Sequence, residues 1–135
     1  MKHLILALAL TLPLSVGAFK PEDLEELKKT HQCPNCDLEG ANLVGANLWS
    51  ADLKGANLRY AKLEGANLEE ANLKDADLLR ANLRDANLDG AYLKGANTKF
   101  AAMKGAILCN TTMPDGRIEY SGCILKRIEE LLERE

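Results

Sequence analysis

Between residues 41 and 68 the chain reads ANLVGANLWSADLKGANLRYAKLEGANL, so that Ala, then usually Asn or Asp, then Leu recur at every fifth residue. A helix turns about 100° per residue, so leucines spaced by five would lie roughly 140° apart and surround its axis. A straight strand would send successive leucines to opposite faces, because the period is odd. A chain that bends once per repeat keeps Ala and Leu on one side, and repeated bends must close into coils that stack. The stretch therefore predicts a solenoid.

The same register runs from Cys36 to Asn110 as fifteen consecutive pentapeptides. The first position is Ala in fourteen of them, the second is Asn or Asp in eleven, and the third is Leu in thirteen, with Thr98 and Met103 as the exceptions. The fifth position is often Gly, which suits a turn that disfavours a Cβ atom. A register maintained over this length is a strong signal for a repeat fold.

This A-N/D-L-x-x run resembles the pentapeptide repeat family, and the resemblance covers 75 of the 135 residues. It implies an all-β solenoid, a right-handed quadrilateral parallel β-helix with four pentapeptides per coil and the Leu and Ala positions inside. It implies little about function, since the repeat builds the shaft of the molecule and not a site.

The first 18 residues read as a secretory signal peptide. A basic start is followed by an apolar run from Leu4 to Val16 and by small residues before Phe19, where we expect cleavage. An uncleaved anchor is the alternative, although the apolar run is short for a bilayer. We therefore expect export, to the periplasm or the thylakoid lumen, with secretion as an alternative, and no membrane attachment after cleavage.

The segments that flank the repeats are predicted to cover the raw backbone edges of the stack. Residues 19–35 read as a short capping helix and a linker, residues 36–110 as the repeat β-helix, and residues 111–123 as a capping turn that contains Pro114, Asp115 and Gly116. Residues 124–135 read as an amphipathic helix with five apolar residues on one face. The alternative for this last helix is a partner protein or dimerisation, either through it or through the end caps.

The four cysteines fall into two pairs, Cys33 with Cys36 and Cys109 with Cys123. In an exported protein we expect two structural disulfides. Continuing the register backwards places Cys33 and Cys36 at inward positions of the Leu and Ala type. The ending CNTTMPDG…SGC also resembles that of small exported pentapeptide repeat proteins of photosynthetic bacteria and the related thylakoid-lumen proteins, which implies a disulfide clamp at the C-terminal end.

Other chemistry for the cysteines is less well supported. His31 with Cys33 and Cys36 could begin a zinc site, but a fourth ligand is missing. Asp37 stands where haem attachment requires His. A thiol–disulfide exchange site at Cys33 and Cys36 needs an α/β unit that the sequence does not predict. The sequence therefore predicts no cofactor, no metal site and no catalytic residues.

Residues twenty apart should lie above one another on the outside of the stack. Tyr60, Arg80 and Phe100 share one such row, in which the guanidinium could stack between two rings. Trp49 is expected to project outward, in the same row as Glu69 and Asp89. These four residues, the three of the Tyr60 row and Trp49, are the candidate interaction patch, and ordinary solvated faces are the alternative.

Three functions remain open at this point. The favoured one is an exported, non-enzymatic structural or protein-interaction module with an unidentified protein partner. A DNA-mimicking topoisomerase-binding protein is the second, but residues 36–110 carry ten acidic and nine basic side chains, and a duplex mimic should be far more negative. A thiol–disulfide redox protein that uses Cys33 and Cys36 is the third.

Overall fold

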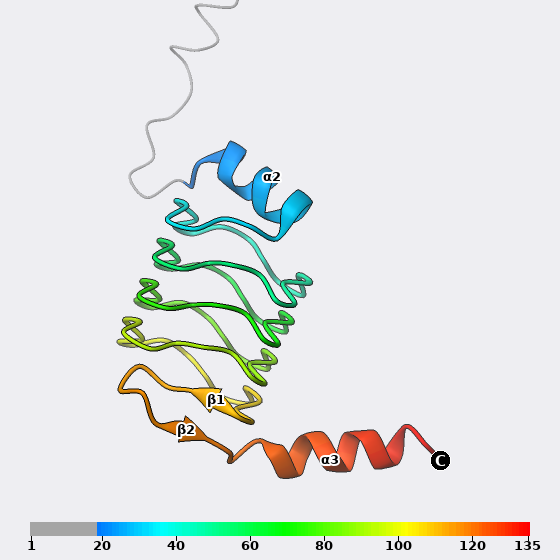
Figure 1. Cartoon of the computed structure of the whole chain (residues 1–135). Coiled ribbons are helices and arrows are strands. Elements are labelled where there is room, and N and C mark those ends of the chain that lie inside the picture. Colours follow the sequence, from blue (N-terminus) through cyan, green and yellow to red (C-terminus); the bar gives the residue numbers. More distant parts are fainter. Residues whose placement is uncertain (1–18) are drawn as a thin grey trace, which may run out of the picture.

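The computed structural model describes residues 19–135, so the predicted signal peptide of residues 1–18 lies outside the described residues. In chain order the elements are helix α2 (Pro21–Thr30), strand β1 (Thr111–Thr112), strand β2 (Ile118–Glu119) and helix α3 (Cys123–Leu132). The repeats between α2 and β1 form a stack of coils. Figure 1 shows α2 at one end of this stack and β1, β2 and α3 at the other.

Each coil of the stack takes twenty residues. Isolated parallel bridges join second-position residues of adjacent coils, from Gln32 with Asp52 to Tyr92 with Thr112. From the first coil to Leu93, the third-position amides donate to a carbonyl of the next coil at N···O distances of 2.7–3.0 Å. The pairing begins before and ends after the predicted limits of 36–110. The coils are therefore connected by continuous backbone hydrogen bonding, which supplies the stability that a narrow core alone could not.

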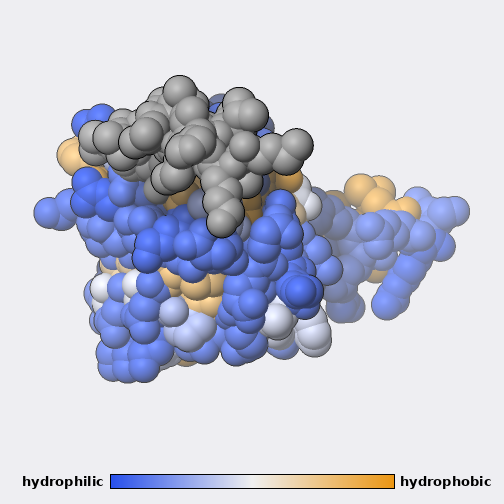
Figure 2. Space-filling view, turned by 90° about the horizontal axis from the view of Figure 1, so that it is seen from above, coloured by the Kyte–Doolittle hydropathy of each residue, from blue (hydrophilic) through white to orange (hydrophobic). Residues whose placement is uncertain are grey.

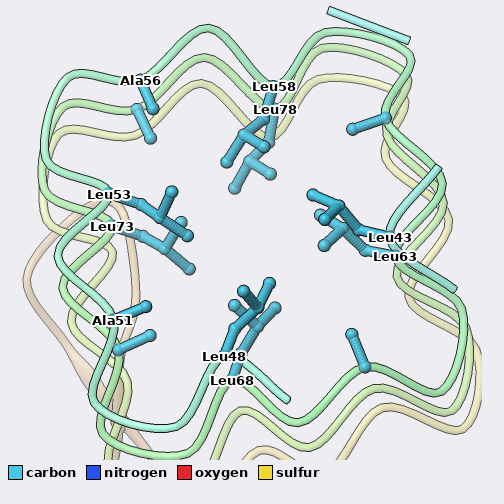
Figure 3. Packing of buried hydrophobic residues seen from close by; sticks show 14 of the residues in the cluster. Leu43, Leu48, Ala51, Leu53, Ala56, Leu58, Leu63, Leu68, Leu73 and Leu78 are labelled. Atoms are coloured by element: carbon cyan, nitrogen blue, oxygen red, sulfur yellow. The ribbon is translucent and has the colours of Figure 1, made fainter. Parts of the chain in front are cut away.

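The interior is a column of aliphatic side chains. Figure 3 shows leucines pointing inward from four sides of a squared coil, with Leu43 above Leu63 and Leu58 above Leu78. The third-position leucines from Leu38 to Leu93 are at most 2% exposed, and most first-position alanines are buried beside them. Each buried leucine contributes about 1.5–3 kcal/mol. The inward placement that the sequence predicted for Leu and Ala is what the structure has.

The conformation at the corners of the coils explains why glycine is frequent at the fifth position of the repeat. From Asn35 to Asn110 this residue has a positive φ in every repeat, 53–60° where it is not glycine and 64–78° where it is. Glycine adopts this conformation at no steric cost, whereas other residues pay for it in strain. Second-position side chains close the same corners. The Oδ1 atom of Asp52, for example, accepts a hydrogen bond from the Lys54 amide at 3.1 Å.

Helix α2 lies on the first coil. Pro21 occupies its first turn with Glu22 and Asp23, and a left-handed His31 ends it. Leu24 and Leu27 are buried and belong to the same cluster as the leucine column.

Two hydrogen bonds attach this helix to the coil below. The Asp37 amide donates to a carboxylate oxygen of Asp23 at 2.7 Å, and the Lys20 amide donates to the Asp37 carbonyl at 3.1 Å. The Asp23 side chain in α2 and the Lys20 backbone just before it thus provide hydrogen-bond partners for backbone groups at the edge of the first coil.

The C-terminal helix does not cover its end of the stack, and that prediction was wrong. No residue of α3 is buried, and Ile124 and Leu132 are 71% and 66% exposed. The helix spans Cys123–Leu132, so it begins one residue before the predicted range of 124–135 and ends three residues before the end of that range. It runs sideways beyond the outline of the coils, where it carries hydrophobic side chains (Figures 1 and 2). The reason is its attachment, because Cys123 is joined to Cys109 on the side of the last coil.

Candidate interaction surfaces

The outer surface consists of rows of side chains that lie above one another. Second-position amides link neighbouring coils, since the Nδ2 atom of Asn57 donates to Oδ1 of Asp37 at 3.1 Å and that of Asn97 donates to Oδ1 of Asp77 at 3.0 Å. These carboxylates therefore accept hydrogen bonds both from their own corner and from the asparagine above or below them in the row. Across residues 19–135, no three His, Cys, Asp or Glu side chains are grouped so that they could hold a metal ion.

The aromatic row brings together two of its three predicted members. The Cζ atom of Arg80 lies 5.7 Å from the centroid of the Phe100 ring, within cation–π range. Phe100 is 79% exposed and Tyr60 is 46% exposed. Tyr60 makes no cation–π contact with Arg80 within the described part of the chain, so the expected stacking between two rings is formed on one side only. All three residues occupy left-handed corners, with φ of 56–57°.

Trp49 projects outward as expected and is 51% exposed. Below it in the same row, Glu69 and Asp89 meet a residue that the sequence did not point to, Lys126 of α3. The Lys126 Nζ atom forms ion pairs with Asp89 and, at 3.7 Å, with Glu69. The hydrogen bond to Asp89 raises the pKa of Lys126 above its ordinary value, and burial opposes this rise.

The sequence offered one indirect signal for this contact. Two carboxylates twenty residues apart, Glu69 and Asp89, lie above one another in adjacent coils, and such a pair favours a cation beside it. Nothing in the repeat identified Lys126 as that cation. In another row, the Glu64 carboxylate accepts a hydrogen bond from Nδ2 of Asn82 at 3.1 Å.

The cysteine pairs lie at opposite ends of the stack. Cys33 and Cys36 are 5.4 Å apart at their Cα atoms, and Cys109 and Cys123 are 4.6 Å apart, both with the geometry of disulfides. Cys33 is 1% exposed and belongs to the core cluster, and Cys36 packs against that cluster. The first pair thus occupies the inward positions that the register assigned to it, and the second pair attaches α3 to the last coil.

A shallow pocket of about 420 Å³ lies beside the β1–β2 hairpin. Its lining residues are Met113, Pro114, Asp115, Arg117, Ile118 and Glu119. Hydrogen bonds from the backbone and side chain of Arg117 lower the pKa of Asp115. The pocket is partly open to solvent. Asp115 forms an ion pair with Arg117, and the Glu119 carboxylate accepts hydrogen bonds from the amides of Tyr120 and Ser121. In the described part of the chain, no helix is both long and apolar enough to cross a membrane.

The repeats are similar to those of known proteins. A family model described as Pentapeptide repeats matches eight copies over residues 33–69 and 61–97. No curated protein matches the chain. Among solved structures, a pentapeptide repeat protein from the cyanobacterium Nostoc is 34% identical over 72% of this chain and 82% of its own, with a TM-score of 0.34.

Two further solved structures are similar. HetL, a pentapeptide repeat protein from Nostoc involved in heterocyst differentiation regulation, is 32% identical over 61% of this chain, with a TM-score of 0.41. A pentapeptide repeat protein from the thylakoid lumen of Arabidopsis thaliana is 29% identical over 70% of this chain, with a TM-score of 0.37. The chain spans 53% of the length of HetL and 59% of the length of the lumen protein.

The family implies a right-handed β-helix solenoid, in agreement with coils of twenty residues and an interior of Leu and Ala. By its repeats, which the family model matches in eight copies, this chain belongs to the pentapeptide repeat family.

Proposed function

We propose that this chain is an exported, non-enzymatic protein-interaction module whose outer rows of side chains bind a partner protein. One observation carries the proposal: aromatic side chains stand exposed on a rigid frame whose interior is filled with aliphatic groups. Phe100, Trp49 and Tyr60 are 79%, 51% and 46% exposed. Aromatic residues and Arg are the types enriched at protein interfaces and at their energetic centres.

The frame suits such a role because it is ordered before binding. The corner residues from Asn35 to Gly95 are attached through their amides to the next coil, as Arg80 is to the Lys99 carbonyl at 3.0 Å. A partner would therefore meet side chains on a backbone that needs little further ordering, which favours affinity. In this proposal α2 is the N-terminal cap, which shields the first coil from pairing with other strands.

Arg80 and Phe100 form the centre of the proposed contact surface. Their cation–π contact orients both side chains, and Tyr60 extends the surface by one coil. We expect replacement of Phe100 by Ala to remove most of the contact area while the stack stays folded, because this ring is largely exposed.

The test is affinity capture from the exported fraction of the source cells, compared between the wild type and Phe100→Ala and Arg80→Ala variants. Arg84→Ala is the matched control, since it removes a guanidinium from a different row. The expected result is one protein that is retained by the wild type and the control and lost by both patch variants, with unchanged melting. Equal capture by all four proteins would refute the patch.

Export is proposed on the sequence of residues 1–18 and is supported by cysteine pairs with disulfide geometry, which persist in oxidising compartments. The measurement is the intact mass of the protein recovered from an exporting host. We expect a chain that begins at Phe19. Recovery of the uncleaved chain from the cytosol alone would contradict export.

The two alternative functions fit the structure less well. A thiol–disulfide exchange site needs an accessible sulfur, but Cys33 is 1% exposed and packs within the core. A DNA mimic needs continuous negative charge, but Arg59 and Lys126 interrupt the carboxylate rows through ion pairs with Asp77 and Asp89.

A further inference from the structure

The C-terminal end of the stack is open along two of its four sides. β2 pairs antiparallel with β1, and the Gly122 amide donates to the Leu108 carbonyl at 2.9 Å, so residues 118–122 cover two sides. On the other two sides, over residues 96–105, the amides of Thr98, Phe100, Met103 and Gly105 donate to no carbonyl within residues 19–135. In the coils above, the corresponding amides all donate to the next coil.

The hydrophobic interior is also exposed at this end. Ala101 and Met103 are partly exposed, whereas the residues above them, Ala81 and Leu83, are 1% and 0% exposed. An edge with unpaired amides and an exposed apolar centre is a surface on which further structure can stack.

Helix α3 is a second uncovered surface at the same end. Its apolar residues lie at helical spacing on one side, and each is between 47% and 71% exposed: Ile124, Leu125, Ile128, Leu131 and Leu132. A ten-residue helix with such a stripe is marginal by itself in water, so a surface that buries the stripe would stabilise it.

Helix α3 is held away from the open end of its own chain. The disulfide between Cys109 and Cys123 fixes its first residue to the side of the last coil. One turn later, the ion pairs of Lys126 with Asp89 and Glu69 hold it beside two higher coils. The two uncovered surfaces therefore lie at one end of the molecule without meeting.

The charges around the two surfaces are complementary. On both open sides of the last coil the fourth-position residue is a lysine, Lys99 and Lys104, and Lys94 stands one coil higher on a third side. None of the three forms an ion pair with a described residue. Beyond Lys126, the C-terminal segment carries more acidic than basic side chains, namely Glu129, Glu130, Glu133 and Glu135 against Arg127 and Arg134. A basic rim around an apolar centre thus matches an apolar stripe with an acidic flank.

We propose that two copies of this chain associate through their C-terminal ends, with the α3 of each copy lying across the open end of the other. The arrangement is isologous, so each copy contributes one lysine rim and one α3 to the same interface. It buries the apolar stripe, covers the exposed edge, and places the glutamates of one copy beside Lys99 and Lys104 of the other.

The test uses charge reversal on the full protein, with molecular mass measured by sedimentation and light scattering over a range of concentrations. One variant carries Lys99→Glu and Lys104→Glu, and the other carries Glu129→Lys and Glu133→Lys. The matched control, Lys54→Glu with Lys62→Glu, reverses two lysines in a coil far from the end. Because the helix buries nothing within its own chain, the glutamate substitutions should leave melting of the monomer unchanged.

We expect the wild type and the control to be dimers, and each charge-reversed variant to dimerise at least about tenfold more weakly. An equimolar mixture of the two variants should recover the dimer, because each reversed rim then meets a reversed helix. A wild type that stays monomeric at every concentration would overturn the proposal. So would a dimer that tolerates both variants, or an α3 that binds lipid vesicles or another protein without self-association.

Discussion

Two adjacent leucines can test whether the leucine column stabilises the fold. Leu78 points into the column and is 0% exposed, whereas Leu79, the next residue, faces outward and is half-buried. Replacing each by Ala makes the same chemical change on the two sides of one backbone. We expect Leu78→Ala to destabilise the protein strongly and Leu79→Ala to have little effect.

The magnitude follows from how little the column can relax. The coil spacing around Leu78 is set by backbone hydrogen bonds, from the Leu58 amide to the Asp77 carbonyl and from the Leu78 amide to the Asn97 carbonyl, both at 2.8 Å. Neighbouring leucines cannot move in to fill the cavity without breaking these bonds. Leu→Ala substitutions in cores cost about 2.7–5.0 kcal/mol, and a rigid site belongs in the upper half of that range.

The assay is urea unfolding followed by circular dichroism, with thermal melting as a second measure. Leu78→Ala should lower the free energy of unfolding by about 3–5 kcal/mol, and Leu79→Ala by less than about 1 kcal/mol. Equal losses for the two variants, or a loss below about 1 kcal/mol for Leu78→Ala, would show that the column is not the source of stability. A lower m-value would indicate that some coils unfold separately.

Three further predictions concern the corners, the attachment of α3 and the cysteines. Gly45→Ala should lower the free energy of unfolding by about 1 kcal/mol, because alanine is strained in the left-handed conformation of a corner that has open space for its Cβ atom. Gly95→Ala should lower it further, because there the new Cβ atom meets the Asp75 carboxylate. Equal losses in urea unfolding would argue against this steric difference. Lys126→Met should lower the free energy of unfolding by up to about 1 kcal/mol near neutral pH, because the ion pair between Lys126 and Asp89 that it removes is partly exposed to solvent. The folded pKa of Lys126 is raised above 10.5, so this loss should be full below that pH and should vanish as pH rises through the folded pKa; a loss that is unchanged at high pH would contradict the ion pair. Peptide mass mapping of the protein purified without reductant should find both cysteine pairs oxidised, whereas free thiols would contradict the structural disulfides.

The repeats determine most of this fold by themselves. A five-residue period is incompatible with a straight helix or strand, so Leu and Ala can share a side only if the chain turns at each fifth residue. The same arithmetic placed Cys33 at an inward position and put Tyr60, Arg80 and Phe100 in one row. Because each coil repeats the one before it, a position in the sequence is also a position in space, and the interior could be assigned residue by residue.

Only the tertiary structure decided what happens where the repeat stops. The amphipathic pattern of α3 showed which residues share a face, but not whether the helix would fold under the stack or leave it sideways. That direction depends on the attachment of Cys123 to Cys109 and on the contact between Lys126 and Asp89, 37 residues apart in the chain. Such contacts join a periodic segment to a non-periodic one, so no spacing rule connects them. Side-chain choices within a row, such as Arg80 packing on Phe100 and not between two rings, likewise depend on local packing that periodicity does not encode.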